Sequence, residues 1–196
     1  MVLRRTVLVA LAAAMATSSL AQTAQNRSLD GALGSDEEYI RKTLSASSLS
    51  LAISRMAQEK LQMDDLREFA QLEAAEQDTL VDVLKSLHSA PTERTIKPPG
   101  EAELEQHGRE ELEKMRGAQA GTEFDRQYLE AQTSGHLELL RIQESYLNSG
   151  RNNLNLLNVA KLARTTLREH LQLLADLESE IESGEATTGA APSHDN

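Results

Sequence analysis

Residues 66–87 read LREFAQLEAAEQDTLVDVLKSL, and this segment carries the clearest helical periodicity in the chain. One side of the predicted helix advances in alternating steps of four and three, the spacing by which helices associate into bundles. The positions on that side are Leu66, Ala70, Glu73, Gln77, Leu80, Leu84 and Leu87. All are apolar except Glu73 and Gln77, so the segment predicts a bundle helix with a polar interruption in its buried face.

Helical patterns also occupy most of the chain on either side of this segment. Ser35, followed by acidic residues, predicts the start of a helix that continues to about Leu61. Prolines and a glycine predict a loop over 89–100. A short acidic helix is predicted after it over Glu101–Met115, followed by two long helices over Glu123–Asn148 and residues 153–183. Aromatic residues make up only 3% of the chain, too few to cover β-sheet faces. We therefore predict an all-α, up-and-down four-helix bundle with an additional short helix between the second and third long helices.

The N-terminus has the three parts of a secretory signal peptide. Arg4 and Arg5 precede an apolar run from Val7 to Ala16, and Ala21 stands at a suitable cleavage position. We predict a signal peptide over 1–21, a flexible lead-in over 22–35, the bundle domain over 36–183 and a disordered tail over 184–196. The chain has no cysteine and hence no residue for a lipid anchor, so the predicted location is periplasmic or secreted.

The charge of the chain narrows the classes of partner. The formal net charge is −11, and this excess of negative charge disfavours contact with nucleic acid and with anionic membrane surfaces. After the signal peptide, no apolar run approaches the roughly 20 residues that a membrane-spanning helix needs. A protein partner, a homodimer and an unidentified small-molecule ligand stay open.

Several short segments resemble a secreted bacterial family, the domain of unknown function 4142. They are Phe69-Ala70, Glu76-Gln77, Gly121-x-x-Phe124-Asp125-x-x-Tyr128-Leu129 with His136, and Glu169-His170-Leu171. The resemblance extends over roughly residues 36–178 and implies a ferritin-like four-helix fold, with no established function. Members commonly carry a Glu in the first helix, where this chain has Ser50 and Ala52, and an Asp-His pair where it has Glu76-Gln77. The resemblance therefore implies two missing ligand positions.

Ferritin-like bundles that hold two irons use a Glu-x-x-His motif on each of two helices. None of the five histidines has a Glu three residues before it, so this motif is absent. A looser set remains, formed by Glu73, Gln77, His136 and His170, which share one layer if the helices pack in sequence order. The set fits a hydrogen-bonded polar layer that fixes helix register; Glu73, His136 and His170 are alternatively candidate metal ligands. We predict no cofactor, with a divalent metal as the alternative.

The other motifs in the sequence indicate no catalytic or ligand-binding site. His107 with Glu110 and Glu111 lies in the acidic segment and is typical of a solvated surface, and Tyr128 and Tyr146 are interpreted as core aromatics. The chain has no nucleophile turn, thiol or phosphate-binding loop, so no catalytic residue is predicted. The sequence favours a non-catalytic binding or stress-related structural module. A ferritin-like metal-binding protein or metal-dependent oxidase is the alternative, and a small-molecule carrier using the serine-rich face of the first helix is a third hypothesis.

Overall fold

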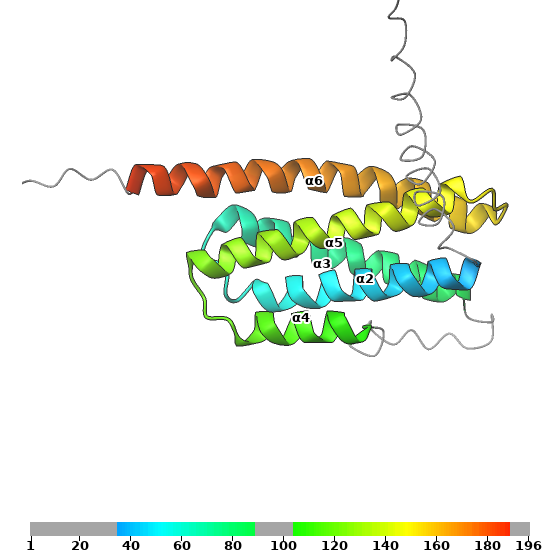
Figure 1. Ribbon diagram of the computed structural model, residues 1–196, viewed down its shortest axis with the longest axis horizontal. Helices are drawn as coiled ribbons and strands as arrows, with labels where there is room; N and C mark the ends of the chain where they lie inside the picture. The colour runs from blue at the N-terminus through cyan, green and yellow to red at the C-terminus, as the bar shows by residue number, and fades with distance from the viewer. Residues whose placement is uncertain (1–34, 89–103, 189–196) are drawn as a thin grey trace, which may run out of the picture.

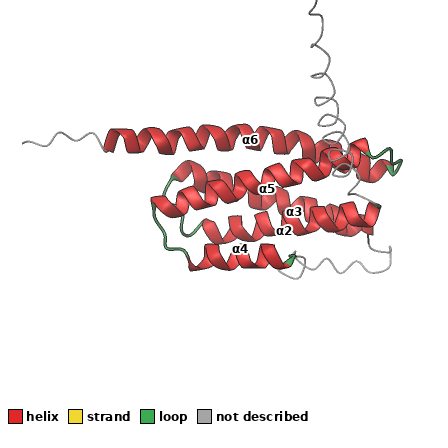
Figure 2. Cartoon of the chain, viewed as in Figure 1, coloured by secondary structure: helices red, strands yellow, loops and turns green. Residues whose placement is uncertain are grey.

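The computed structural model describes residues 35–88 and 104–188, and within these ranges it is all-α, without a strand (Figure 2). The elements are α2 (Asp36–Ala57), α3 (Asp64–His88), α4 (Gln106–Gly117), α5 (Thr122–Asn148) and α6 (Leu154–Thr188). The predicted four-helix bundle, with a short helix between the second and third long helices, is confirmed. The predicted signal peptide, nearly all of the lead-in, the loop over 89–100 and the end of the tail lie outside the described residues.

Neighbouring long helices in the bundle run antiparallel. Helix α2 packs against α3 and α5, and α6 packs against α5 and α3, while α4 lies along the outside of α2. Figure 1 shows α2 and α6 running in one direction and α3 and α5 in the other. This arrangement brings one face of each long helix to a common interior.

The turn between α2 and α3 corrects the sequence prediction of a helix reaching Leu61. Helix α2 begins as predicted, with the Ser35 side chain accepting a hydrogen bond from the Glu38 amide, but it ends at Ala57. The reason lies in α5, where the Asp125 carboxylate accepts hydrogen bonds from the amides of Gln62 and Met63, both at 3.0 Å. These donors would otherwise continue the helix, so their capture by Asp125 turns the chain into α3.

The remaining helix limits differ by a few residues from the prediction. The acidic helix α4 is described over Gln106–Gly117, and α5 ends as expected before Gly150, which has a φ of 73°. Helix α6 continues past the predicted end at Ser183 to Thr188, so the first residues of the predicted tail are helical. Gly184 costs a helix about 1 kcal/mol, but the good helix formers Glu185 and Ala186 follow it.

Two clusters of buried apolar side chains lie among the described residues. The first surrounds Phe69, Phe124 and Tyr128 near the α2–α3 turn. The second lies toward the other end, where the rings of Tyr39 and Tyr146 stack with centroids 4.0 Å apart. Between them along α3, α5 and α6 lie buried polar residues, and this polar layer is the candidate functional site.

Candidate metal centre

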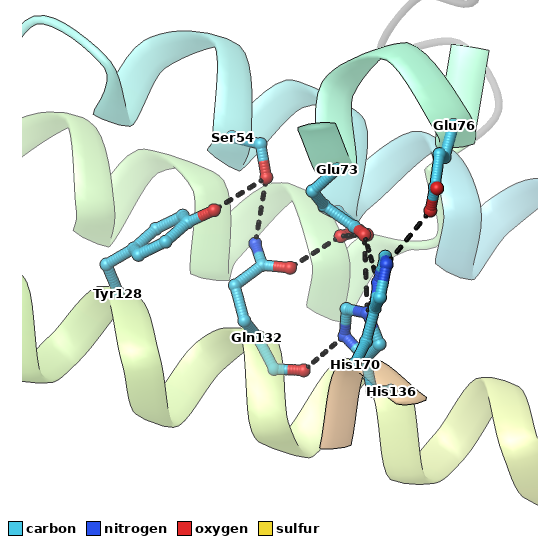
Figure 3. A network of polar contacts seen from close by, with 8 residues as sticks. Ser54, Glu73, Glu76, Tyr128, Gln132, His136 and His170 are labelled. Atoms are coloured by element: carbon cyan, nitrogen blue, oxygen red, sulfur yellow. Dashed lines mark hydrogen bonds and ion pairs between the residues drawn. The ribbon is translucent and has the colours of Figure 1, made fainter. Parts of the chain in front are cut away.

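Three helices each contribute one buried ligand-type side chain to the polar layer (Figure 3). Glu73 on α3 and His136 on α5 are fully buried, and His170 on α6 is 5% exposed. Glu73 Oε2 lies 3.3 Å from His136 Nε2 and 3.1 Å from His170 Nδ1, and the two nitrogens are 3.1 Å apart. The structure thus brings together Glu73, His136 and His170, the three candidate metal ligands of the sequence.

Contacts at the far side of each ring favour a proton on the nitrogen that lies there. His136 Nδ1 lies 2.7 Å from the Gln132 backbone oxygen, which can only accept, so this nitrogen is the donor. His170 Nε2 lies 3.0 Å from Glu76 Oε2 in an ion-pair contact, so the carboxylate favours a proton on this nitrogen. In the neutral rings, His136 Nε2 and His170 Nδ1 therefore carry lone pairs.

The consequence is that three electron-rich atoms face one another. Two imidazole lone pairs and one carboxylate oxygen form a triangle with no hydrogen between them unless a ring becomes protonated. A cation at the centre relieves this repulsion. In a tetrahedral site with metal–nitrogen bonds of 2.0–2.1 Å, ligand atoms are about 3.3 Å apart, close to the separations in this triangle. The arrangement suits a single proton or a single small metal ion.

The electrostatics of this triangle favour a bound cation. Burial would raise the pKa of Glu73, but its contacts with the His136 and His170 rings, which donate to it when protonated, and with Ser50 outweigh this effect and lower the pKa to about 2. Burial likewise opposes protonation of His170, yet its hydrogen bond to Glu73 and the charges of Glu73 and Glu76 raise its pKa. Glu73 is therefore ionised, and His170 holds a proton more tightly than an ordinary histidine does.

A chain of hydrogen bonds connects the triangle to α2. Ser50 Oγ donates to the other carboxylate oxygen of Glu73 at 2.5 Å and lies 2.7 Å from Gln132 Oε1. The Gln132 amide donates to Ser54 Oγ at 3.2 Å, and Ser54 is 3.0 Å from the hydroxyl of Tyr128. These contacts explain the presence of Ser50 and Ser54 in α2, whereas the buried hydroxyls of Ser47 and Ser48 have no hydrogen-bond partner among the described residues.

The sequence analysis missed the residues that orient the triangle. The side chains of the triangle are each contacted by a further residue: His170 by Glu76, Glu73 by Ser50, and His136 by Gln132. None of these three residues lies in a recognisable ligand spacing. Glu76 could have been found because it stands three residues after Glu73 on the same helix. Contact between Ser50 and Glu73 depends on the packing of α2 against α3, which no local pattern reveals.

The other candidates lie away from the triangle. Gln77 is 4% exposed, but it contacts neither histidine through a hydrogen bond, and its Oε1 has no partner among the described residues. His107 and Glu110 are exposed on α4 and Glu111 is half-buried there. Within residues 35–88 and 104–188, the triangle is the only group of three or more such side chains whose ligand atoms converge.

The Phe124-Asp125-x-x-Tyr128 segment has structural roles. Phe124 is buried with Lys60 Nζ 5.3 Å from its ring centre, Asp125 holds the α2–α3 turn, and Tyr128 contacts Ser54. Burial raises the pKa of the Tyr128 hydroxyl, so it stays neutral. This segment positions the helices that carry the triangle and contributes no donor atom to it.

The fold and the buried polar layer define a ferritin-like helical bundle protein. The chain belongs to the family described as a domain of unknown function, DUF4142, which matches residues 12–177. A crystal structure of a putative secreted protein, DUF305, from Streptomyces coelicolor shares the fold at 14% identity and a TM-score of 0.57. The similarity covers 74% of this chain and 91% of that one. No curated protein matches the chain.

The di-iron centre of ferritin-like proteins does not fit the residues present. That centre needs several carboxylates converging on two metals from all four helices. Here one carboxylate, from Glu73, reaches the triangle, while Glu76 lies on the opposite side of the His170 ring and Ser50 takes the α2 side. The donor set suits one ion, not two.

Proposed function

We propose that this protein is a non-catalytic binding protein that holds one divalent transition-metal ion between Glu73, His136 and His170. The observation that carries the proposal is the convergence of two imidazole lone pairs and a carboxylate oxygen, all within 3.3 Å of one another. The other nitrogen of each imidazole contacts an oxygen, the Gln132 carbonyl for His136 and the Glu76 carboxylate for His170, as in metal-binding histidines.

The donor set selects a class of metal. Two imidazoles and one carboxylate suit Zn²⁺ and neighbouring first-row divalent ions, whereas Ca²⁺ and Mg²⁺ prefer oxygen ligands alone. Three protein donors also leave a fourth position for water or another small ligand. Burial of the triangle between two apolar clusters keeps the imidazoles in place before the ion arrives, which reduces the entropic cost of binding.

A location outside the cytoplasm is part of the proposal. The N-terminus has the signal-peptide pattern, and the similar Streptomyces protein is described as secreted. None of the described helices combines the length and apolar character that crossing a membrane requires. A binding protein in that compartment would meet metal ions directly and would need no nucleotide or reduced cofactor.

Titration of the purified protein tests the proposal. After chelator treatment, isothermal calorimetry with Zn²⁺ should show about one tight site per chain, and Co²⁺ should give the visible absorption of a tetrahedral site. His136→Gln should weaken Zn²⁺ affinity by about a hundredfold or more, because it removes one of three donors. His107→Gln on exposed α4 is the matched control and should bind like the unmodified protein.

Two results would overturn the metal proposal. One is the absence of Zn²⁺, Co²⁺, Cu²⁺ and Fe²⁺ binding above the level of the doubly substituted His136→Gln, His170→Gln protein. The other is equal loss of binding in the His107→Gln control, which would place the ion on the surface. Circular dichroism of each variant distinguishes lost donors from lost fold.

A further inference from the structure

A groove of about 400 Å³ lies on the outside of the bundle between α3 and α6, beside the metal centre. It extends along α3 from Ala75 to Val83, about 12 Å at 1.5 Å per residue. Its walls are largely aliphatic and include the following side chains: Leu80, Val83, Val159, Leu162, Ala163 and Leu167. Leu162 is 72% exposed at its edge, although large aliphatic side chains are usually covered.

The polar groups at one end of the groove accept hydrogen bonds. Glu76 lines the groove with a side chain that is 38% exposed, while one of its carboxylate oxygens contacts His170. Gln77 also lines it, and its buried Oε1 has no hydrogen-bond partner among the described residues. Buried polar atoms are nearly always paired, so an unpaired acceptor at the edge of a groove indicates a missing donor.

The groove carries a single kind of charge. Among the described residues that line the groove, Glu76 is the only ionisable one, and none is a lysine, arginine or histidine. A ligand that fits therefore has an aliphatic body for the walls and a cationic, hydrogen-donating head for Glu76 and Gln77. An ammonium group has three N–H donors, enough for one acceptor on each of these two residues.

We propose that the groove between α3 and α6 is a binding site for amphiphilic primary amines. The alkyl chain lies between Val83 and Leu162, and the ammonium group binds the Glu76 carboxylate and Gln77 Oε1. An octyl chain is comparable in length to the groove. A carboxylate or phosphate head is disfavoured because it would face Glu76, and a second copy of this chain would bring a surface of net charge −11 against the same acidic end.

Binding of octylamine to the chelator-treated protein tests the proposal without metal. Calorimetry should give one saturable site for octylamine, and butylamine should bind about tenfold more weakly or worse, because it covers less of the apolar walls. Octanol should bind more weakly than octylamine, and octanoate should not bind. Because no metal is present, failure of this test is distinct from failure of the metal proposal.

Substitutions locate the ligand within the groove. Glu76→Gln should weaken octylamine binding about fivefold while leaving octanol unchanged, because it removes the charge and keeps the shape. Ala163→Phe should fill the groove and abolish binding of both. Glu130→Gln, an exposed carboxylate on α5, is the control and should leave binding unchanged.

Three outcomes would overturn the amine site. The first is no saturable octylamine binding, and the second is equal binding of octylamine and octanoate, which would indicate a non-specific apolar surface. The third is a dimer, detected by light scattering, that Leu162→Glu converts to a monomer without changing amine binding. That result would assign the groove to contact with a second copy of the chain. Proton chemical shifts of Val83 and Leu162 that move with octylamine would support the site directly.

Discussion

Replacing Glu73 with Gln substitutes an NH2 group for one carboxylate oxygen and preserves the size of the side chain. Ser50 can still donate to the remaining oxygen, as it does to Glu73 at 2.5 Å. The new amide nitrogen lies where Glu73 Oε2 is now, 3.3 Å from His136 Nε2 and 3.1 Å from His170 Nδ1. It can therefore donate one hydrogen to each neutral imidazole.

The effect of Glu73→Gln on the free energy of unfolding should change with pH. The pKa of Glu73 falls from an ordinary value of 4.5 to about 2, so its stabilising contribution is present above 4.5 and disappears as the pH falls toward 2. The pKa of His170 is raised above its ordinary 6.5, so its contribution is present below 6.5 and disappears as the pH rises through the raised value. The ion pair is therefore most stabilising at weakly acidic pH.

These shifts set the expected magnitudes. At about pH 6, the variant should lose about 3 kcal/mol, the value of the Glu73 pKa shift at 1.36 kcal/mol per unit. At a pH above the raised pKa of His170, that ring is neutral in both proteins and the unmodified carboxylate faces two lone pairs. The variant instead makes two neutral hydrogen bonds of about 1 kcal/mol each, so its deficit should vanish or reverse.

Urea unfolding in the presence of chelator, followed by far-ultraviolet circular dichroism, measures this difference at each pH. Ser54→Ala, in the same hydrogen-bond chain but outside the triangle, is the control and should give a difference that does not vary with pH. A loss of stability in Glu73→Gln that stays constant from about pH 6 to alkaline pH at which His170 has lost its proton would refute the assignment of lone pairs to His136 Nε2 and His170 Nδ1.

Two further substitutions test how the helices are held around the centre. Asp125→Ala should lower the free energy of unfolding by about 3 kcal/mol, because the amides of Gln62 and Met63 lose their acceptor, and Asp125→Asn should recover part of this loss in urea unfolding. Lys60→Met should lower the free energy of unfolding by about 1 kcal/mol and make α4 more sensitive to proteolysis. The reason is that Lys60 Nζ donates to the carbonyls of Arg116 and Ala118 at 2.6 and 2.8 Å. Lys60→Arg should retain most of the protection from proteolysis.

Local periodicity predicted the helices well because each buries one face. The seam that begins at Leu66 is buried at most of its apolar positions, and its interruption at Glu73 correctly marked where polar groups enter the interior. Ser35 predicted the start of α2 through its side-chain cap, which depends only on residues a few positions away. Features determined by neighbours in sequence were therefore accessible.

Features determined by contacts between distant segments could not be predicted from the sequence. The end of α2 at Ala57 depends on Asp125, more than a helix away in sequence, and no propensity of residues 58–61 predicts it. The polar layer was recognised only in part, because the role of Glu76 depends on the orientation of the His170 ring. Gln77 was expected to act with Glu73, but a step of four residues along α3 places it at the groove, without a hydrogen bond to either histidine.

The triangle joins two helical hairpins, since Glu73 belongs to the α2–α3 pair and both histidines belong to the α5–α6 pair. A cation at its centre binds both hairpins at once, whereas the hydrogen bonds within each hairpin do not depend on it. A bound cation would therefore add to the contacts that Asp125 and Gln132 already make between the hairpins, and the two hairpins should unfold more cooperatively with the ion than without it. Backbone amides far from the triangle, on α2 and α6, should report the difference through the rate at which their hydrogens exchange with solvent.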